Sequence, residues 1–319
     1  MAGSPEFTTT TTKGDILTIR DACTPEEHDI FLQWSDACQW DPCPSDYAIY
    51  GQIPTNRMLL GFVQGRIVAC LAVHVFENRV VFFGPYIVLN PMDRGKGYGH
   101  CMLQYMLDQF PDYDIGCDTE LDRIEYYHRY GMETYYTVYC VRGDLPTPLM
   151  SQAARHLSEY QLVSATEISL DFIVNMDYEV TGFRRTDFCQ KKFHDPSQSA
   201  FALCSADQKE ILGLACIAPT ISPGLYLISP LYAKSPRVAR ALALELMQRV
   251  VDQHNVTSDM NTYLNFTLYC QETNPDALDL FLNVFGWKSV GVYKRLWKGG
   301  IPTAQYPQRL YGYNNSECG

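Results

Sequence analysis

The residues best suited to chemistry lie at positions 89–99, where the sequence reads LNPMDRGKGYG. Its three glycines occur at alternate positions, so successive backbone N–H groups can converge on one anion without obstruction from Cβ atoms. A helix that begins here would add the positive end of its dipole, and Arg94 and Lys96 would add positive charge. The run therefore predicts a cradle for a phosphate or pyrophosphate group.

Three other interpretations apply to a glycine-rich run of this kind. Glycine-rich turns also join strands to helices for purely structural reasons. A dinucleotide-binding unit needs parallel strands and an acidic residue about 20 positions further on, whereas antiparallel strands are expected before this run. A phosphate-loop nucleotidase needs Gly-Lys followed by Ser or Thr, and that sequence is absent.

The elements that must position this run follow from the period of the apolar residues. Three strand-like segments joined by short turns precede it, at residues 58–63, 67–76 and 80–89. Residues 97–110 carry apolar side chains at helical spacing, which predicts a helix lying on the sheet. A short strand, a helix and a further strand are expected next, at residues 115–117, 122–130 and 133–141.

The run resembles motif A of the GNAT acetyltransferases, Val-x-Pro-x-x-Arg-Gly-x-Gly-x-Gly, with Leu89 at the valine position and Pro91 and residues 94–99 matching. The order of elements over residues 13–143 is similar too. The resemblance implies acetyl-coenzyme A (acetyl-CoA) as cosubstrate, a strand that splays from its neighbour at Leu89, and an oxyanion held by backbone near that residue. The cofactor-binding residues that it implies are Ile87, Leu89, Arg94, Gly95, Lys96, Gly97, Tyr98 and Gly99.

Residues 126–132, YYHRYGM, are similar to the Phe-Tyr-x-x-x-Gly-Phe helix end of the same family, with Tyr127 at the tyrosine position. By this resemblance the Tyr127 hydroxyl protonates the departing thiolate. The alternative is a tyrosine that only bridges core and solvent. Glu120 and Arg123 stand where many relatives have Asn and Ala, so this part departs from the family pattern.

An ammonium acceptor must lose a proton before it can attack, which requires a carboxylate, a histidine or a water chain. His74, Asp118 and Glu120 lie on or just after strands expected to border the site, and each can instead satisfy local hydrogen bonds. We take Tyr127 and Glu120 as the catalytic candidates. In relatives, one segment forms the wall of the acceptor pocket. The residues of that segment that could bind the substrate here are Asp41, Asp46, Tyr47 and Tyr50. The alternative is that this segment is a solvated loop.

The second half repeats the order of the first, with strands and helices of similar spacing. It resembles, more weakly, the GNAT-like C-terminal domain of two-domain acetyltransferases. Its residues 233–237 read AKSPR at the cradle position, without glycine, and Leu282 replaces the expected tyrosine, so a second active site is not expected. Asp177 and Arg185 are expected to pair and hold a turn.

Length and composition agree with an α/β protein of tandem GNAT folds, each a mixed and mainly antiparallel sheet flanked by helices. A chain of 319 residues favours two cores over one. The expected parts are a tag and disordered leader (1–12), a catalytic GNAT domain (13–145), a linker (146–162), a degenerate GNAT-like domain (163–300) and a tail of unknown use (301–319).

Charge and cysteine content exclude several classes of function. The net charge of −11 argues against a nucleic-acid surface. Twelve cysteines occur without Cys-x-x-Cys or zinc spacing, so no metal site is expected. No apolar run is long enough to cross a membrane and no secretory signal opens the chain, which predicts a cytoplasmic protein.

These observations predict an acetyl-CoA-dependent N-acetyltransferase that acts by direct attack of a primary amine of a small molecule. Two alternatives stay open: a non-catalytic sensor or scaffold module that binds acetyl-CoA, and an enzyme that transfers a longer acyl group or acylates a hydroxyl. The sequence does not name the acceptor or the oligomeric state.

Overall fold

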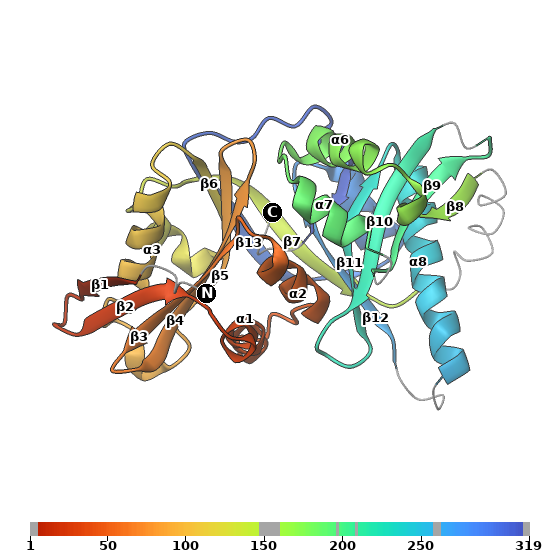
Figure 1. Ribbon diagram of the computed structural model, residues 1–319. Coiled ribbons are helices and arrows are strands. Elements are labelled where there is room, and N and C mark those ends of the chain that lie inside the picture. The colour runs from red at the N-terminus through yellow and green to blue at the C-terminus, as the bar shows by residue number, and fades with distance from the viewer. Residues whose placement is uncertain (1–5, 147–159, 196–197, 208–209, 258–262, 315–319) are drawn as a thin grey trace.

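The computed structural model describes residues 6–146, 160–195, 198–207, 210–257 and 263–314. Within these ranges the strands join into one fourteen-stranded sheet that runs through both halves of the chain (Figure 1). We call residues 6–146 the first half and residues 160–314 the second half.

The first half supplies strands β1 to β7 and the helices around them. Its strands are β1 (Phe7–Thr10), β2 (Ile16–Asp21), β3 (Arg57–Val63), β4 (Arg66–Phe76), β5 (Val80–Ile87), β6 (Asp114–Glu120) and β7 (Glu133–Gly143). Its helices are α1 (Pro25–Ala37), α2 (Pro44–Gln52), α3 (Tyr98–Gln109) and α4 (Ile124–His128). The antiparallel meander that the sequence predicts corresponds to β3, β4 and β5.

The second half follows a similar order of strands and helices. Its strands are β8 (Tyr160–Ser164), β9 (Ala200–Ser205), β10 (Ile211–Pro219), β11 (Leu225–Ala233), β12 (Asn265–Gln271), β13 (Lys288–Lys298) and β14 (Leu310–Gly312). Its helices are α6 (Leu170–Thr181), α7 (Thr186–Phe193), α8 (Pro236–Thr257) and α9 (Pro275–Leu278). Most of the expected linker lies outside the described residues, and its last three positions belong to β8.

Proline begins four of these helices, α1, α2, α8 and α9. The first position of a helix needs no intrahelical N–H bond, and the fixed φ of proline suits it. In α1 the Thr24 side chain also accepts a hydrogen bond from the Glu27 backbone N–H at 3.3 Å, which satisfies one of the open donors of the first turn.

The two halves exchange strands at the centre of the sheet. β13 of the second half lies between β6 and β7 of the first, with Tyr293 opposite Glu120. β7 pairs on its other side with β12, where Leu268 lies opposite Val141. The last long strand of each half is therefore built into the sheet of the other half.

Three larger hydrophobic cores hold helices on both faces of this sheet. Alternate residues of the meander point to opposite faces, so Leu60 and Leu59 belong to different cores. Helices α1, α2, α6 and α7 share one core that spans both halves. Helix α3 covers the other face in the first half, and α8 covers it in the second.

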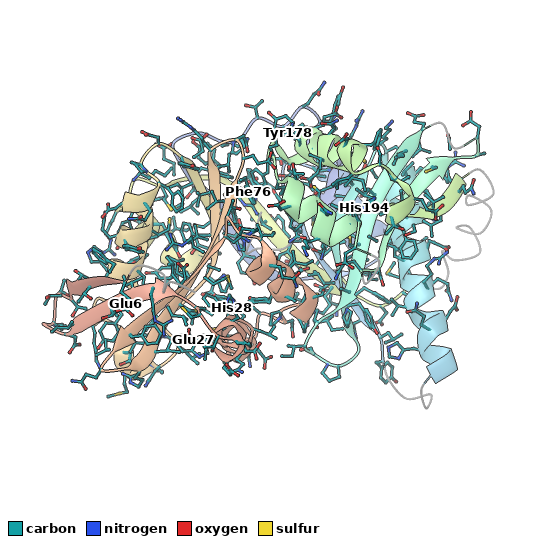
Figure 2. All side chains as sticks on the ribbon, viewed as in Figure 1. Glu6, Glu27, His28, Phe76, Tyr178 and His194 are labelled. Atoms are coloured by element: carbon teal, nitrogen blue, oxygen red, sulfur yellow. The ribbon has the colours of Figure 1, made fainter. Side chains whose placement is uncertain are left out.

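A fourth, smaller cluster joins the halves directly. Phe76 at the end of β4, labelled in Figure 2, stacks on Phe183 of the second half with ring centroids 5.1 Å apart. Val80, Phe82 and Trp297 complete the cluster. Because aromatic rings bury large areas, this contact adds to the shared sheet in fixing the halves together.

The placement of residues 7–12 outside the fold is wrong. Residues 7–10 form β1, antiparallel to β2. Phe7 stacks on Tyr105 of α3 at 4.8 Å, and Thr11 is buried. A run of threonines looks like low complexity, but β-branched side chains favour strands, and β2 offers them a free edge.

Candidate functional site

Strands β5 and β6 are paired for only a short distance and then diverge. Their parallel ladder ends at Phe82 opposite Gly116, although β5 continues to Ile87 and β6 to Glu120. Residues of both strands beyond the ladder line a cavity of about 720 Å³. The divergence therefore opens a cleft in the sheet of the first half, and β5 ends at Ile87, two residues before the expected strand end at Leu89.

The glycine run forms one end of this cleft, at the start of α3. Gly95 and Gly97 have positive φ angles of 77° and 93°, a conformation that other residues adopt only with strain. A Cβ on Gly99 would lie 2.6 Å from the Tyr86 hydroxyl. The turn and the close packing both require glycine, and Gly95, Gly97 and Gly99 all line the cavity.

Charged side chains fix the loop that leads into this helix. Arg66 binds both carboxylate oxygens of Asp93, at 2.6 and 3.0 Å. This pairing, together with Lys96 at 3.1 Å, lowers the pKa of Asp93 to about 2. Arg94 donates from Nε to the carbonyl of Val88 at 3.0 Å, so its guanidinium is held at the rim of the cleft.

Seven of the eight residues expected to bind the cofactor line the cavity. Lys96 is the exception, because its ammonium group is directed to Asp93. Both catalytic candidates line the same cavity, Tyr127 from α4 and Glu120 from the end of β6. The structure thus brings together residues that are spread over about forty positions of the sequence.

Burial governs the chemistry available to Tyr127. Its side chain is only 8% exposed, and burial raises its pKa well above the ordinary value, with Cys117 and Tyr126 adding to the effect. The hydroxyl therefore keeps its proton at neutral pH and can donate it. Glu120 is exposed and lines the same cavity.

Asp118 and His74, the other two candidates for a base, are engaged in the protein interior. Arg295 of β13 binds both oxygens of Asp118, at 2.6 and 2.7 Å. Burial would lower the pKa of Arg295, but the Asp118 carboxylate outweighs it and the pKa is raised. Burial lowers the pKa of His74 to about 4, so His74 is neutral and lies 3.1 Å from the Gly84 carbonyl.

The four residues expected in the acceptor wall are not among the described residues that line the cavity. Asp41 binds Arg142 and Ser222, and Asp46 forms a buried ion pair with Lys192. The Tyr47 hydroxyl donates to Ser35 at 2.7 Å, and Tyr50 is buried in the shared core. These side chains hold α2 and the preceding loop against the second half.

Comparisons with known proteins agree with this geometry. A family described as "Acetyltransferase (GNAT) domain" matches residues 173–277. Holothin acyltransferase of Pseudoalteromonas sp. (strain SANK 73390) is 26% identical over 240 residues, 74% of this chain and 76% of that protein. A solved structure from Pyrococcus horikoshii superposes with a TM-score of 0.71 and 19% identity, over 95% of this chain and 96% of its own. A tandem GNAT protein from the clavulanic acid biosynthesis pathway superposes with a TM-score of 0.62 and 13% identity, over 88% and 98%.

Residues 173–277 therefore match a GNAT acetyltransferase family, and the chain is similar in sequence to an acyltransferase. Its two halves form a tandem GNAT-like fold, and the family match falls on the second half. In that half Asp177 and Arg185 pair at 2.9 Å and are both buried, as expected from the sequence. The Tyr232 hydroxyl donates to the same carboxylate at 2.6 Å.

The sequence did not indicate several residues that line the first-half cleft. Tyr293 lines it from β13 of the second half, and Cys38 and Trp40 line it from the end of α1. Thr12, which was set aside with the leader, lines it too. Tyr293 carries no local signal, because it reaches the cleft only through the exchanged strand, whereas an aromatic residue just after a helix, such as Trp40, could have been noted.

No helix in the described ranges of the chain combines the length and the apolar character needed to cross a membrane. No group of three or more His, Cys, Asp or Glu side chains in the same ranges could hold a metal ion.

Proposed function

We propose that this chain transfers an acyl group from an acyl-CoA thioester to a primary amine of a small molecule, and that the acyl group is acetyl. GNAT enzymes use acyl-CoA donors, and the observation that supports a donor site here is the cleft of the first half. Diverging strands, a glycine-rich helix start and Tyr127 border one cavity of about 720 Å³. Arg94 supplies positive charge at its rim for a pyrophosphate.

The reaction forms one C–N bond and breaks one C–S bond. As the amine attacks the thioester carbon, backbone N–H groups near Leu89 stabilise the negative charge on the carbonyl oxygen. Tyr127 gives its proton to the departing sulfur and regains one from solvent. Glu120 accepts the proton that the amine loses, directly or through water.

The acceptor belongs, in this proposal, to the class of small-molecule amines. The curated relative is named for holothin, and we infer an acceptor of that kind. Tyr293 of the second half lines the same cavity as Glu120, which supports an acceptor site to which both halves contribute. Sites between structural units are common for small molecules.

We assign the donor site to the catalytic GNAT domain, residues 13–145, and treat residues 163–300 as a degenerate GNAT-like domain. The segment between β11 and α8 supports this division. It lacks glycine, and Lys234, which occupies part of it, binds Glu210 at 2.6 Å. A pyrophosphate would find no glycine cradle there.

Calorimetric titration of acetyl-CoA tests the donor site. We expect saturable binding by the wild type and loss of at least about tenfold in affinity in Arg94→Glu, because the charge beside the pyrophosphate is reversed. Arg129→Glu is the matched control, since Arg129 is exposed on the helix end and its Nε donates only to the Glu125 carbonyl.

Release of free thiol in the presence of an amine panel that includes holothin then tests the reaction. Turnover with amines and acetyl-CoA supports the proposal. A preference for longer acyl-CoA donors would contradict acetyl as the acyl group but leave acyl transfer to an amine in place. Absence of acetyl-CoA binding, or an equal loss in the Arg129→Glu control, contradicts the assignment of the site.

A further inference from the structure

The second half has a cleft like that of the first, but the chain itself fills it. Strands β11 and β12 are paired in parallel only from Leu225 to Leu227, a ladder as short as that of β5 and β6. Beyond it, β14 pairs with β11 at Leu231 and Tyr232. The backbone N–H of Tyr313 donates to the Tyr269 carbonyl of β12 at 2.8 Å, so residues 310–313 bridge the diverging strands.

Buried polar and apolar contacts fix this segment, which we call the C-terminal insert, residues 306–314. The Asn274 amide donates to the carbonyls of Gln308 and Leu310, both at 2.9 Å. Tyr311 and Tyr313 are 1% and 3% exposed. The insert is thus part of the core, and no comparable segment among the described residues fills the cleft of the first half.

One contact path leads from the insert to β6 in the first half. The Tyr313 ring lies 4.4 Å from the Arg295 guanidinium. Its hydroxyl donates its one proton to the Gln271 amide oxygen at 2.6 Å and lies 2.9 Å from the Tyr136 hydroxyl, which can donate to it. Arg295 holds Asp118 at 2.6 Å. Asp118 lines the first-half cleft just beyond the end of the β5–β6 ladder.

A second path leads to β5. The Asn314 amide donates to the Tyr50 hydroxyl at 3.0 Å, and the Tyr50 ring packs edge-on against His74 at 4.5 Å. His74 lies within hydrogen-bonding distance of the Gly84 carbonyl, at 3.1 Å, and Gly84 lines the cleft. The end of the insert therefore supports both strands close to the point where they separate.

We propose that the C-terminal insert occupies in the second half the place that acyl-CoA takes in the first, and that Tyr313 is a positioning residue for the acyl-CoA site. The inference rests on the proposed function of the first-half cleft. By this inference the chain has one donor site. The separation of β5 from β6 then depends on Tyr313, which lies outside the catalytic GNAT domain.

Three full-length variants test the role of Tyr313. Tyr313→Ala removes the ring from Arg295, and we expect kcat/KM for acyl-CoA to fall about tenfold, the effect of losing a buried cation–π contact together with its hydrogen bonds. Tyr313→Phe keeps the ring and loses the hydroxyl, so it should melt at a lower temperature yet keep kcat/KM within about twofold of wild type. Tyr311→Leu is the matched control in the same insert, because Tyr311 lies on β14, two residues before Tyr313, and packs into the core under α8 and not against Arg295.

If kcat/KM falls in proportion to the melting temperature in all three variants, the positioning role is overturned, because a purely structural residue would give that result. Calorimetric stoichiometry tests the rest: one acyl-CoA per wild-type chain supports the occupied second cleft, and two overturn it. If the wild type binds acyl-CoA but Tyr313→Ala turns over like wild type, the inference alone fails. If the wild type binds none, the proposed function fails.

Discussion

At the scale of single residues, burial decides which side chains can move protons. Tyr127 and His74 are both buried near the cleft, and burial favours the uncharged form of each. For Tyr127 the uncharged form carries the proton that a leaving thiolate needs. For His74 it leaves a neutral ring held near the Gly84 carbonyl, which suits a structural role better than a catalytic one.

Replacing Tyr127 by phenylalanine should separate catalysis from binding. The ring and its packing stay, but the acid is lost, so we expect kcat to fall by about 100-fold or more with little change in acyl-CoA affinity. Tyr126→Phe is the control, because Tyr126 lines the same cavity and bonds to the Tyr86 hydroxyl at 2.9 Å. Steady-state kinetics beside calorimetry measure both quantities, and equal kcat in the two variants would remove Tyr127 from the mechanism.

His74 should make stability depend on pH in the mildly acidic range. Its pKa is about 4 in the fold and 6.5 ordinarily, so the unfolded chain binds the proton more readily. The stability is therefore complete above pH 6.5 and is lost as pH falls toward 4, by about 3 kcal/mol over that range. Urea unfolding between pH 4.5 and 7 measures it, and a His74→Gln variant should show a flatter slope than wild type. Equal slopes would contradict the shift.

At the scale of elements, the two strands beside β13 each carry a glycine that leaves room for a tryptophan. Gly116 of β6 lies opposite Trp297 of β13, and a Cβ on Gly116 would lie 2.6 Å from the Trp297 ring. Gly143 of β7 lies in the same way under Trp287. Glycine in these strands thus serves close approach of a large side chain.

The Gly116→Ala variant should lose about 1–3 kcal/mol of unfolding free energy, because the buried Trp297 ring must move. Combined with Trp297→Phe, the loss should be smaller than the sum of the two single variants, since both changes act on one contact. Gly300→Ala is the control, where the added methyl would come no closer than 3.4 Å to another atom. Chemical denaturation gives all four values, and strict additivity would contradict the contact.

What the sequence could predict follows from how local each signal is. The motif run, the meander before it and the helix after it are set by neighbouring residues, and they lie where the pattern places them. The contact of Lys96 with Asp93 could not be predicted because it depends on the fold around it, and binding of a phosphate by Lys96 stays a prediction. Tyr293 and Arg295 were missed because only the pairing of β13 with β6 brings them to the site, and no periodicity within either strand indicates that partner.

At the scale of the whole molecule, the exchange of β7 and β13 makes the two halves one folding unit. The shared sheet and the shared core under α1, α2, α6 and α7 cross the boundary between them. In the first half expressed alone, β6 and β7 would lack β13 between them. In the second half expressed alone, β12 and β13 would lack β7 between them. The contacts between the halves therefore do more to hold them together than the peptide segment that joins them.

A protease site inserted between Pro146 and Tyr160 tests this. After cleavage, we expect the two fragments to coelute in size-exclusion chromatography and to keep their affinity for acyl-CoA, because interleaved strands hold them together. They should separate only in denaturant. Fragments that come apart in buffer would show that the exchanged strands contribute little.

The exchanged strand also governs when the site can exist during protein synthesis. Arg295 follows its partner Asp118 by 177 positions, and a ribosome needs on the order of 10 to 35 s to add that many residues. Until β13 has emerged, β6 has an open edge and Asp118 lacks the cation that pairs with it in the complete fold. The edge of β6 therefore stays unpaired for many seconds in a nascent chain. An unpaired strand edge can pair with another chain and aggregate, so chaperones would protect the nascent chain during this interval.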